Sequence, residues 1–270
     1  MSTMTTPVET MPDIQSSVDT RRIPIQKVGV KDVTYPMLLQ TDTEVLPTVA
    51  EWELTVALPA EEKGTHMSRF LELLEQYRTQ PMSMSGFCQM TAAMLGLLNA
   101  VEGDVTATFP YFMNKVAPVS GVASLLDYQV SWTANAMATV DDEVDVQFEL
   151  TVLVPVTSLC PCSKAISQYG AHNQRSHVTV SVVGHPEHLD MDSLIQTIEA
   201  QASCELWGLL KRTDEQYVTE RAYENPKFVE DLVRDVAVAI GQMDGIEGYR
   251  IEAENFESIH NHSAYAVVEG

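Results

Sequence analysis

Regular alternation of apolar and polar residues is the strongest pattern along this chain, and it predicts β-strands. In the stretch 51–58, apolar residues fall at every second position, beginning with Trp52 and ending with Leu58. Equally regular alternation covers 126–133, 145–154 and 178–182. A period of two places one set of side chains on a single face, so each stretch is predicted to be a half-buried strand. Weaker strand patterns cover 23–35, 105–113, 248–255 and 262–268.

Four other stretches repeat apolar residues at helical spacing and carry start or stop signals. The third has a capping box formed by Ser193 and Gln196, and the fourth has a proline at its predicted first position. We expect the helices to begin near Thr65, Ser85, Ser193 and Asn225. The last three are expected to end near Asn99, Lys211 and Gly241.

In chain order, these elements form two successive ββααββ units. Two helices on one face of a four-stranded antiparallel sheet make an α+β unit, so the order predicts an internal duplication. We expect a tail at 1–20, a first unit at 21–138 and a second unit at 139–270. Element order alone carries this prediction, since the halves share no convincing residue identity.

Composition narrows the class of protein. The chain has 270 residues, of which 45% are hydrophobic, so it can bury a substantial core. Its formal net charge of −22 repels phosphate backbones and anionic lipids, which argues against nucleic acid or a membrane as partner. The first twenty residues lack a basic start with an apolar core, so no secretory signal is expected. We therefore expect a cytoplasmic protein with four reduced cysteines.

The stretch 158–176 gathers reactive side chains between two predicted strands. It contains Cys160, Cys162 and His172, together with the cations of Lys164 and Arg175. Nearby positive charge favours the thiolate, the form of cysteine that attacks carbon or binds metal. The alternative is a pair of buried structural thiols, but the polar company favours chemistry.

Several motifs in the chain resemble those of the type IB GTP cyclohydrolases. They are Cys-Pro-Cys-Ser-Lys at 160–164, Tyr-Gly-Ala-His-Asn-Gln-Arg-Ser at 169–176, Asn-Phe-Glu-Ser-Ile-His-Asn-His at 255–262, Gly-Thr-His-Met-Ser-Arg-Phe at 64–70 and Gln-Ser-Ser-Val-Asp at 15–19. The resemblance implies a tandem tunnelling fold that assembles as a homotetramer, with barrels of antiparallel sheet and active sites at interfaces. It also implies conversion of GTP and water into 7,8-dihydroneopterin 3′-triphosphate and formate, the first step of folate and pterin biosynthesis.

A second reactive cluster near the end of the chain contains Glu257 and His260, three residues apart. In a flat strand these two side chains would lie on opposite faces, so the strand must break after Asn255 if they act together. Thiolate, imidazole and carboxylate suit a borderline divalent metal such as zinc, iron or manganese. The resemblance assigns Cys160 and His172 to catalysis and the metal site to the following residues: Cys160, His172, Glu215, Glu257 and His260. Cys160 has three possible roles, as metal ligand, proton donor or nucleophile.

The resemblance also supplies substrate contacts. Glu230 resembles the family's anchor for the guanine edge, although its local pattern alone slightly favours an exposed helix glutamate paired with Arg234. Candidates for the triphosphate are Lys164, Arg175, His66 and Arg69. Without the resemblance, Glu215 would be a solvated charge in a loop between helices.

Two other functions compete with the cyclohydrolase. A tunnelling-fold nitrile reductase acting on a deazaguanine also uses a cysteine, but it needs a nicotinamide cofactor and no catalytic metal. A noncatalytic protein holding structural zinc is the second, but Cys-x-Cys is tighter than the usual zinc knuckle. The cluster around Glu257 argues against the first alternative.

Overall fold

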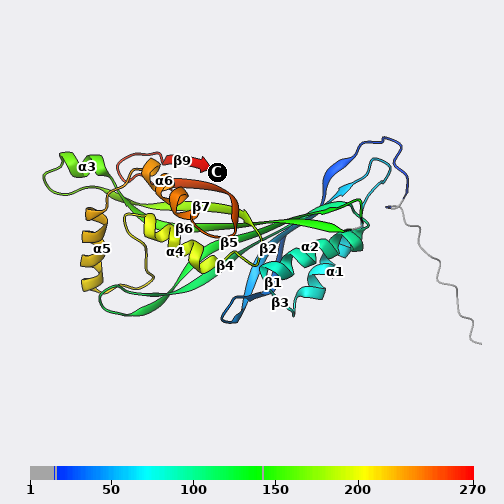
Figure 1. Cartoon of the computed structure of the whole chain (residues 1–270), viewed down its shortest axis with the longest axis horizontal. Coiled ribbons are helices and arrows are strands. Elements are labelled where there is room, and N and C mark those ends of the chain that lie inside the picture. Colours follow the sequence, from blue (N-terminus) through cyan, green and yellow to red (C-terminus); the bar gives the residue numbers. More distant parts are fainter. Residues whose placement is uncertain (1–14, 16, 142) are drawn as a thin grey trace, which may run out of the picture.

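The computed structural model describes residues 15, 17–141 and 143–270, and these form one long twisted sheet with helices on one side (Figure 1). The sheet has nine strands in the order β3-β1-β2-β4-β5-β6-β7-β8-β9. All pairs are antiparallel except β1 with β3. The strands are β1 (Ile25–Gln40), β2 (Val45–Leu58), β3 (Pro81–Met82), β4 (Glu102–Val116), β5 (Ala123–Ala138), β6 (Val144–Leu159), β7 (Asn173–Gly184), β8 (Ile246–Asn255) and β9 (Ala264–Glu269).

The helices fall into two groups at the two ends of the sheet (Figure 1). Those described are α1 (Met67–Tyr77), α2 (Met84–Leu98), α3 (Pro161–Ile166), α4 (Met191–Gln201), α5 (Arg212–Glu224) and α6 (Val229–Ile240). Helices α1 and α2 cover the strands of the first half, and α4 and α6 cover those of the second. The α+β prediction of two ββααββ units is confirmed, with β3, α3 and α5 as additions. The predicted boundary at 138–139 falls between β5 and β6, where the sheet continues without a break.

Strand alternation divides the sheet into an apolar and a polar face. The apolar face packs against the helices and buries an aromatic group in edge-to-face contact around Trp132, which Phe87, Phe109 and Phe148 surround. The opposite face carries rows of hydroxyls, such as Thr108 donating to Ser131 at 3.0 Å. The hydrophobic effect therefore fixes which face meets the helices.

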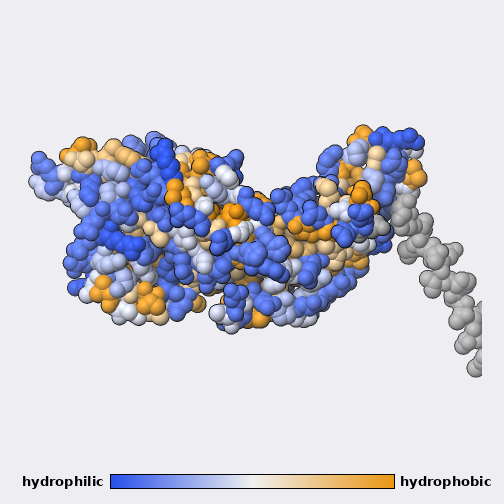
Figure 2. Space-filling model, in the orientation of Figure 1, coloured by the Kyte–Doolittle hydropathy of each residue, from blue (hydrophilic) through white to orange (hydrophobic). Residues whose placement is uncertain are grey.

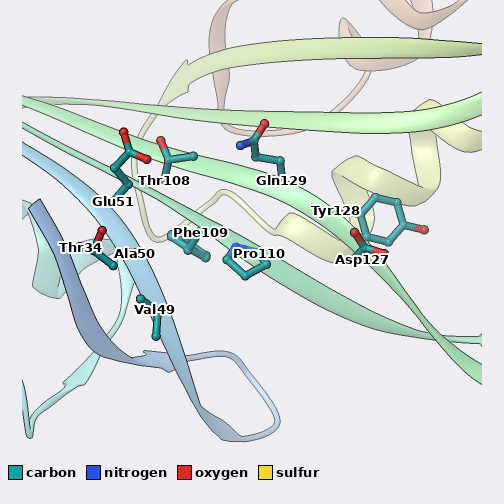
Figure 3. Close-up of a pocket in the computed structure, with 10 residues that line it drawn as sticks. All are labelled: Thr34, Val49, Ala50, Glu51, Thr108, Phe109, Pro110, Asp127, Tyr128 and Gln129. Atoms are coloured by element: carbon teal, nitrogen blue, oxygen red, sulfur yellow. The ribbon is translucent and has the colours of Figure 1, made fainter. Parts of the chain in front are cut away.

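A groove of about 400 Å³ opens where strands β2 and β4 separate (Figure 3). Their pairing stops at Glu51 and Thr108, and beyond that point Pro110 stands on the free edge of β4. Proline cannot donate to a neighbouring strand, so it suits an unpaired edge. The groove is lined by side chains of both faces, among them the exposed Glu51 and the buried Phe109.

The predicted helix from Ser193 to Lys211 is wrong in both its bounds. Asp190, not Ser193, caps α4, and its carboxylate accepts the backbone N–H of Ser193. The helix ends at Gln201 because the chain then turns to pair with β6, through the Thr157–Cys204 bridge. A separate helix, α5, follows from Arg212, and no sequence signal predicted it.

Other predicted ends shift by a few residues. His66 rather than Thr65 is the N-cap of α1, and Phe228 rather than Asn225 is the N-cap of α6. Gly241 ends α6 as predicted. Of the predicted tail at 1–20, residues 1–14 and 16 lie outside the described part of the chain, while 17–19 hydrogen-bond to 61–63.

Candidate functional site

Cys160 and His172 lie side by side at the end of the sheet, at the point where β6 ends and β7 begins. The Cys160 backbone N–H donates to the His172 carbonyl at 3.1 Å, which extends the ladder between the two strands by one bond. Ser163 closes the turn, since its hydroxyl donates to the Cys160 carbonyl and accepts the His172 N–H at 3.2 Å. The predicted loop is therefore a rigid turn built around helix α3.

The two thiols of the Cys-Pro-Cys turn have different environments. Cys160 is the N-cap of α3, is half-buried, and its Sγ accepts the Ser163 N–H at 3.4 Å. Cys162 lies on α3 and is exposed. Burial raises the pKa of Cys88 to about 11 and of Cys204 to about 12, so these two thiols are inert at neutral pH.

A buried polar row crosses the three strands that lead into the site. Ser158 of β6, Ser176 of β7 and Asn255 of β8 face the core, each at most 3% exposed. The Ser176 hydroxyl donates to Asn255 Oδ1 at 2.7 Å, and its oxygen lies 2.8 Å from that of Ser158. Cys160 lies two residues after Ser158, and Glu257 lies two residues after Asn255, the last residue of β8. The row therefore aligns the ends of the strands that lead to these two candidate side chains.

The C-terminal cluster begins where β8 ends, at Asn255, as the sequence predicts. The Phe256 N–H donates to the Arg175 carbonyl at 3.0 Å and turns the chain toward His172. The Ser258 hydroxyl then lies 3.4 Å from His172 Nδ1. Glu257 is half-buried and His260 is exposed, with the His260 and His262 rings stacked at 5.1 Å. This contact brings together two segments of the chain whose contacting residues are 86 positions apart.

Among the described residues, no three His, Cys, Asp or Glu side chains lie close enough to hold a metal ion. Cys160 and His172 are neighbours, and Glu257 is in the adjoining loop, so the donor types fit a borderline divalent metal. Ser258 and Gln174, which sequence reasoning missed, are the contacts that organise His172. A polar residue at a core-facing strand position is the signal that marks Gln174.

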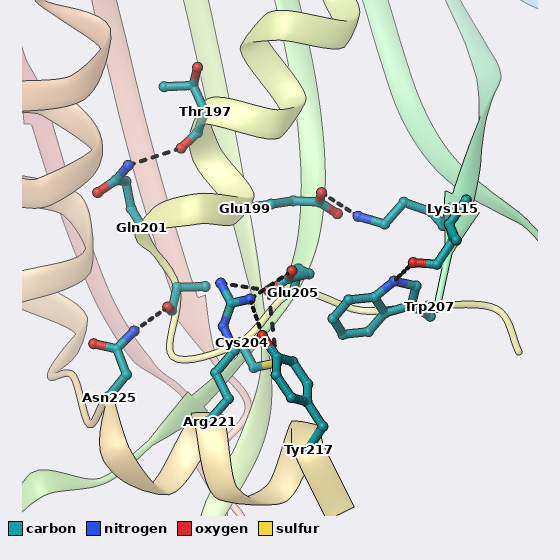
Figure 4. Close-up of polar contacts among 12 residues, drawn as sticks. Lys115, Thr197, Glu199, Gln201, Cys204, Glu205, Trp207, Tyr217, Arg221 and Asn225 are labelled. Carbon is teal, nitrogen blue, oxygen red and sulfur yellow. Dashed lines mark hydrogen bonds and ion pairs between the residues drawn. The ribbon is translucent and has the colours of Figure 1, made fainter. Parts of the chain in front are cut away.

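Glu215 lies in the first turn of α5, and its side chain is exposed. Its neighbour Asp214 is fully buried and accepts hydrogen bonds from the backbone of Val119, Ser120 and Lys211. Glu215 is thus solvent-exposed, as in the alternative interpretation of this residue, but it lies on a helix and not in a loop between helices. A second set of bonds fixes the rest of α5, with Arg221 paired to Glu205 and the Asn225 amide donating to the Ala202 carbonyl (Figure 4).

The candidate substrate contacts are spread over the chain. The Lys164 ammonium donates to the Tyr223 carbonyl and lies 4.4 Å from the centre of the Tyr223 ring, so it ties α3 to α5. Arg175 is exposed on β7 near the site. Glu230 is exposed in the first turn of α6, and Arg234 pairs with Asp231 at 4.0 Å.

His66 and Arg69 lie far from Cys160 within this chain. Helix α1, which carries Arg69, and helix α3 stand at opposite ends of the molecule (Figure 1). Arg69 donates to the Leu97 carbonyl at 3.1 Å. One chain therefore does not bring all the predicted site residues together.

Comparison with known proteins gives the family. The family model described as "Type I GTP cyclohydrolase folE2" matches residues 11–266. The chain is 66% identical over 265 residues to "GTP cyclohydrolase FolE2" of Bordetella petrii, covering 98% of each, and 59% identical over 263 residues to that of Cupriavidus necator, covering 97% of this chain and 96% of the relative.

Among solved structures, a urate oxidase from Bacillus sp. TB-90 superposes with a TM-score of 0.50 at 9% identity, covering 91% of this chain and 99% of that one. This likeness shows the fold alone, and it confirms the predicted tunnelling fold. Within the described residues, none of the helices is long and apolar enough to span a membrane. The family match decides between the functions that the sequence left in competition: the chain belongs to the type I GTP cyclohydrolases of the FolE2 family, the type IB branch.

Proposed function

We propose that this GTP cyclohydrolase converts GTP and water into 7,8-dihydroneopterin 3′-triphosphate and formate at the site formed by the β6–β7 turn and the loop after β8. The observation that carries the assignment is the contact between Ser258 and His172, because it joins the two reactive clusters. The product is the first intermediate of folate and pterin biosynthesis.

The family is metal-dependent in general, and a divalent ion is the cofactor. The side chains proposed to hold it are Cys160, His172, Glu215, Glu257 and His260. Such an ion, when bound by these residues, would supply a water of lowered pKa, the kind of nucleophile needed at C8 of guanine to open the imidazole ring and release formate. Zinc, manganese and iron(II) all suit this mixed set of sulfur, nitrogen and oxygen donors.

His172 is proposed to carry protons during ring opening and the later ribose rearrangement, because imidazole exchanges protons readily near neutral pH. Cys160 stands directly beside it and offers a thiol as ligand, acid or nucleophile. Spectra of the cobalt-substituted protein separate these roles, since a thiolate ligand gives an intense charge-transfer band that a free thiol does not.

Substrate recognition is proposed to use Glu230 for the guanine edge, since a carboxylate accepts both the N1–H and the 2-amino group. The triphosphate is assigned to Lys164, Arg175, His66 and Arg69. Because α1 and α3 stand at opposite ends of the chain, His66 and Arg69 must come from a neighbouring copy. This supports a homotetramer with active sites at its interfaces.

Exposed apolar side chains support assembly. At the end of the molecule that carries α3, Ile166 is 84% exposed and Tyr169 is 97% exposed, and apolar surface is visible there in Figure 2. Side chains of this kind on an outer surface are typical of contacts between subunits. All four cysteines are unpaired, which fits the proposed cytoplasmic location.

The decisive experiment is to incubate the purified protein with GTP and a divalent metal, oxidise the mixture, and measure pterin fluorescence and formate. We expect one formate for each pterin formed. If neither pterin nor formate forms with zinc, with manganese or with iron(II), the proposal is contradicted.

A further inference from the structure

Gln174 makes the shortest polar contact with the His172 ring among the hydrogen bonds of the described residues, and it has no role in the function proposed above. Its side-chain oxygen Oε1 lies 3.1 Å from His172 Nδ1. The residue is 8% exposed, on the core-facing side of β7, directly across from Ser158 of β6. The backbone of Gln174 is therefore fixed within β7, opposite the buried Ser158 of β6.

The chemistry of this contact determines where the histidine carries its proton. In the structure Oε1 rather than the amide nitrogen of Gln174 faces the ring, and with that orientation the ring nitrogen is the donor, because a carboxamide oxygen only accepts hydrogen bonds. Neutral His172 is then protonated on Nδ1, and its lone pair is on Nε2. The Ser258 hydroxyl, 3.4 Å from the same nitrogen, accepts or donates equally well and adapts to either form.

The backbone of Gln174 is held in the ladder between β6 and β7. Ser176, the next core-facing residue of β7, bonds to Asn255 at 2.7 Å, within the row that joins the ends of β6, β7 and β8. Gln174 lies beside this row in the β6–β7 ladder, and its burial limits the orientations that its amide can take, so its hydrogen bond can hold one ring orientation.

We propose that Gln174 is a positioning residue, which holds His172 in the Nδ1–H tautomer and thereby presents Nε2 to the metal or to the reacting atoms. Partners of this kind fix the tautomer and orientation of histidine ligands in many metal sites. The inference rests on the proposed role of His172, but the tautomer itself is measurable without turnover.

The test uses the full-length protein labelled with ¹⁵N-histidine, first with zinc bound and then after treatment with a chelator. Long-range ¹H–¹⁵N spectra at alkaline pH, where neutral rings prevail, show which nitrogen carries the proton, and the His172→Gln variant assigns the signal. We expect Nδ1 of His172 to be protonated in both states. An Nε2–H tautomer would overturn the proposal.

Two substitutions separate positioning from space filling. In Gln174→Leu, with no acceptor, we expect the Nδ1–H preference to disappear and kcat and zinc affinity each to fall about 10- to 100-fold, with KM for GTP little changed. In Gln174→Glu, which keeps an acceptor oxygen, we expect the tautomer to be retained and kcat to stay within about tenfold of the wild-type value. The matched control Gln242→Leu, at an exposed glutamine just after α6, should change none of these.

If Gln174→Leu folds and keeps both the wild-type tautomer and kcat, the proposal is wrong. If it does not fold, loss of the Nδ1–H tautomer in Gln174→Glu overturns the proposal instead. A failure of the proposed function would give a different result. An active His172→Ala variant would show that His172 is not catalytic, but it would leave the Nδ1–H tautomer measured in the wild-type protein unchanged.

Discussion

Cys160 lies at the end of β6, and hydrogen bonds to its backbone N–H and carbonyl hold it in place. Its side chain can therefore be replaced to test the role of the thiol alone. The Cys160 N–H is bonded to the His172 carbonyl, so replacement of the side chain leaves the backbone ladder intact. We expect Cys160→Ala to lose at least about a thousandfold in turnover, the scale seen when a group central to the chemistry is removed. Steady-state rates of pterin formation measure the loss.

Cys162→Ala is the matched control. Because Pro161 stiffens the turn, the sequence predicts that only one thiol faces His172 and that the other packs against the loop and stabilises it, but Cys162 is exposed. We now expect its replacement to change the free energy of unfolding by no more than about 0.5 kcal/mol. Equal rate losses in the two variants at equal Tm would show that both thiols take part.

Glu257 and His260 belong to the loop after β8 and not to the core. Glu257 is half-buried and His260 is exposed, so neither side chain supports much of the fold. We expect Glu257→Gln and His260→Ala each to abolish turnover while the thermal unfolding curve stays close to that of the wild type. A variant that kept its metal content and a near-normal rate would exclude that residue from the site.

Motifs identified the reactive side chains, but they did not identify the residues that hold them. Cys160, His172, Glu257 and His260 lie within runs that resemble one family. Ser158 and Asn255 serve the site through a third residue, Ser176, which lies 79 residues from Asn255 in the sequence. Such contacts depend on cross-strand register, which a single sequence does not specify.

At the scale of elements, helix α5 illustrates why some predictions failed. It carries charged and polar residues around most of its surface, and only Asp214 and Ala222 are buried. Helical periodicity of apolar residues was therefore too weak to reveal it. Strands such as β6, whose apolar residues alternate regularly and whose core face is buried from Phe148 onward, were predicted well.

Asp214 anchors α5 to the β4–β5 turn, and its replacement tests that anchoring. Burial opposes ionisation of this carboxyl, but hydrogen bonds from the Ser120 hydroxyl and from the N–H groups of Ser120, Lys211 and Val119 outweigh it and hold the pKa well below the ordinary 3.8. A lowered pKa in the folded state means that the stabilisation is fully present above about pH 4 and is lost as the pH falls toward the folded value.

We therefore expect Asp214→Asn to lower the urea midpoint at about pH 7, and the gap to the wild type to narrow as the pH falls below about 4. Asp231→Asn is the matched control, because Asp231 also accepts the N-cap N–H of its helix, at 3.2 Å, but is partly exposed. It should have the smaller effect. A gap that stays constant with pH would mean that the charge of Asp214 does not contribute.

At the scale of the whole molecule, the order of elements predicted the fold class and the family resemblance predicted the tunnelling fold, but neither could place the two ends of the chain relative to each other. The continuous pairing of β5 with β6 makes one long sheet and separates α1 from α3. The proposal that a second copy supplies His66 and Arg69 rests on that separation. We expect light scattering to give a mass about four times the 29.9 kDa of the chain, and a monomer with full activity would contradict the assignment of His66 and Arg69.

The candidate metal donors come from separate segments, and within the described chain no three of them converge on one point. An ion that binds only the folded protein stabilises it, because its binding free energy adds to the free energy of unfolding. We expect removal of metal by a chelator to abolish turnover and to lower Tm. Zinc, manganese and iron(II) should each restore activity in part, because mixed sulfur, nitrogen and oxygen donors do not select a single ion. The test measures metal content by elemental analysis, Tm and the rate of pterin formation on the same samples. Full activity in the metal-free protein would exclude a catalytic ion. Recovery with zinc alone would show that the site is more selective than its donor types predict.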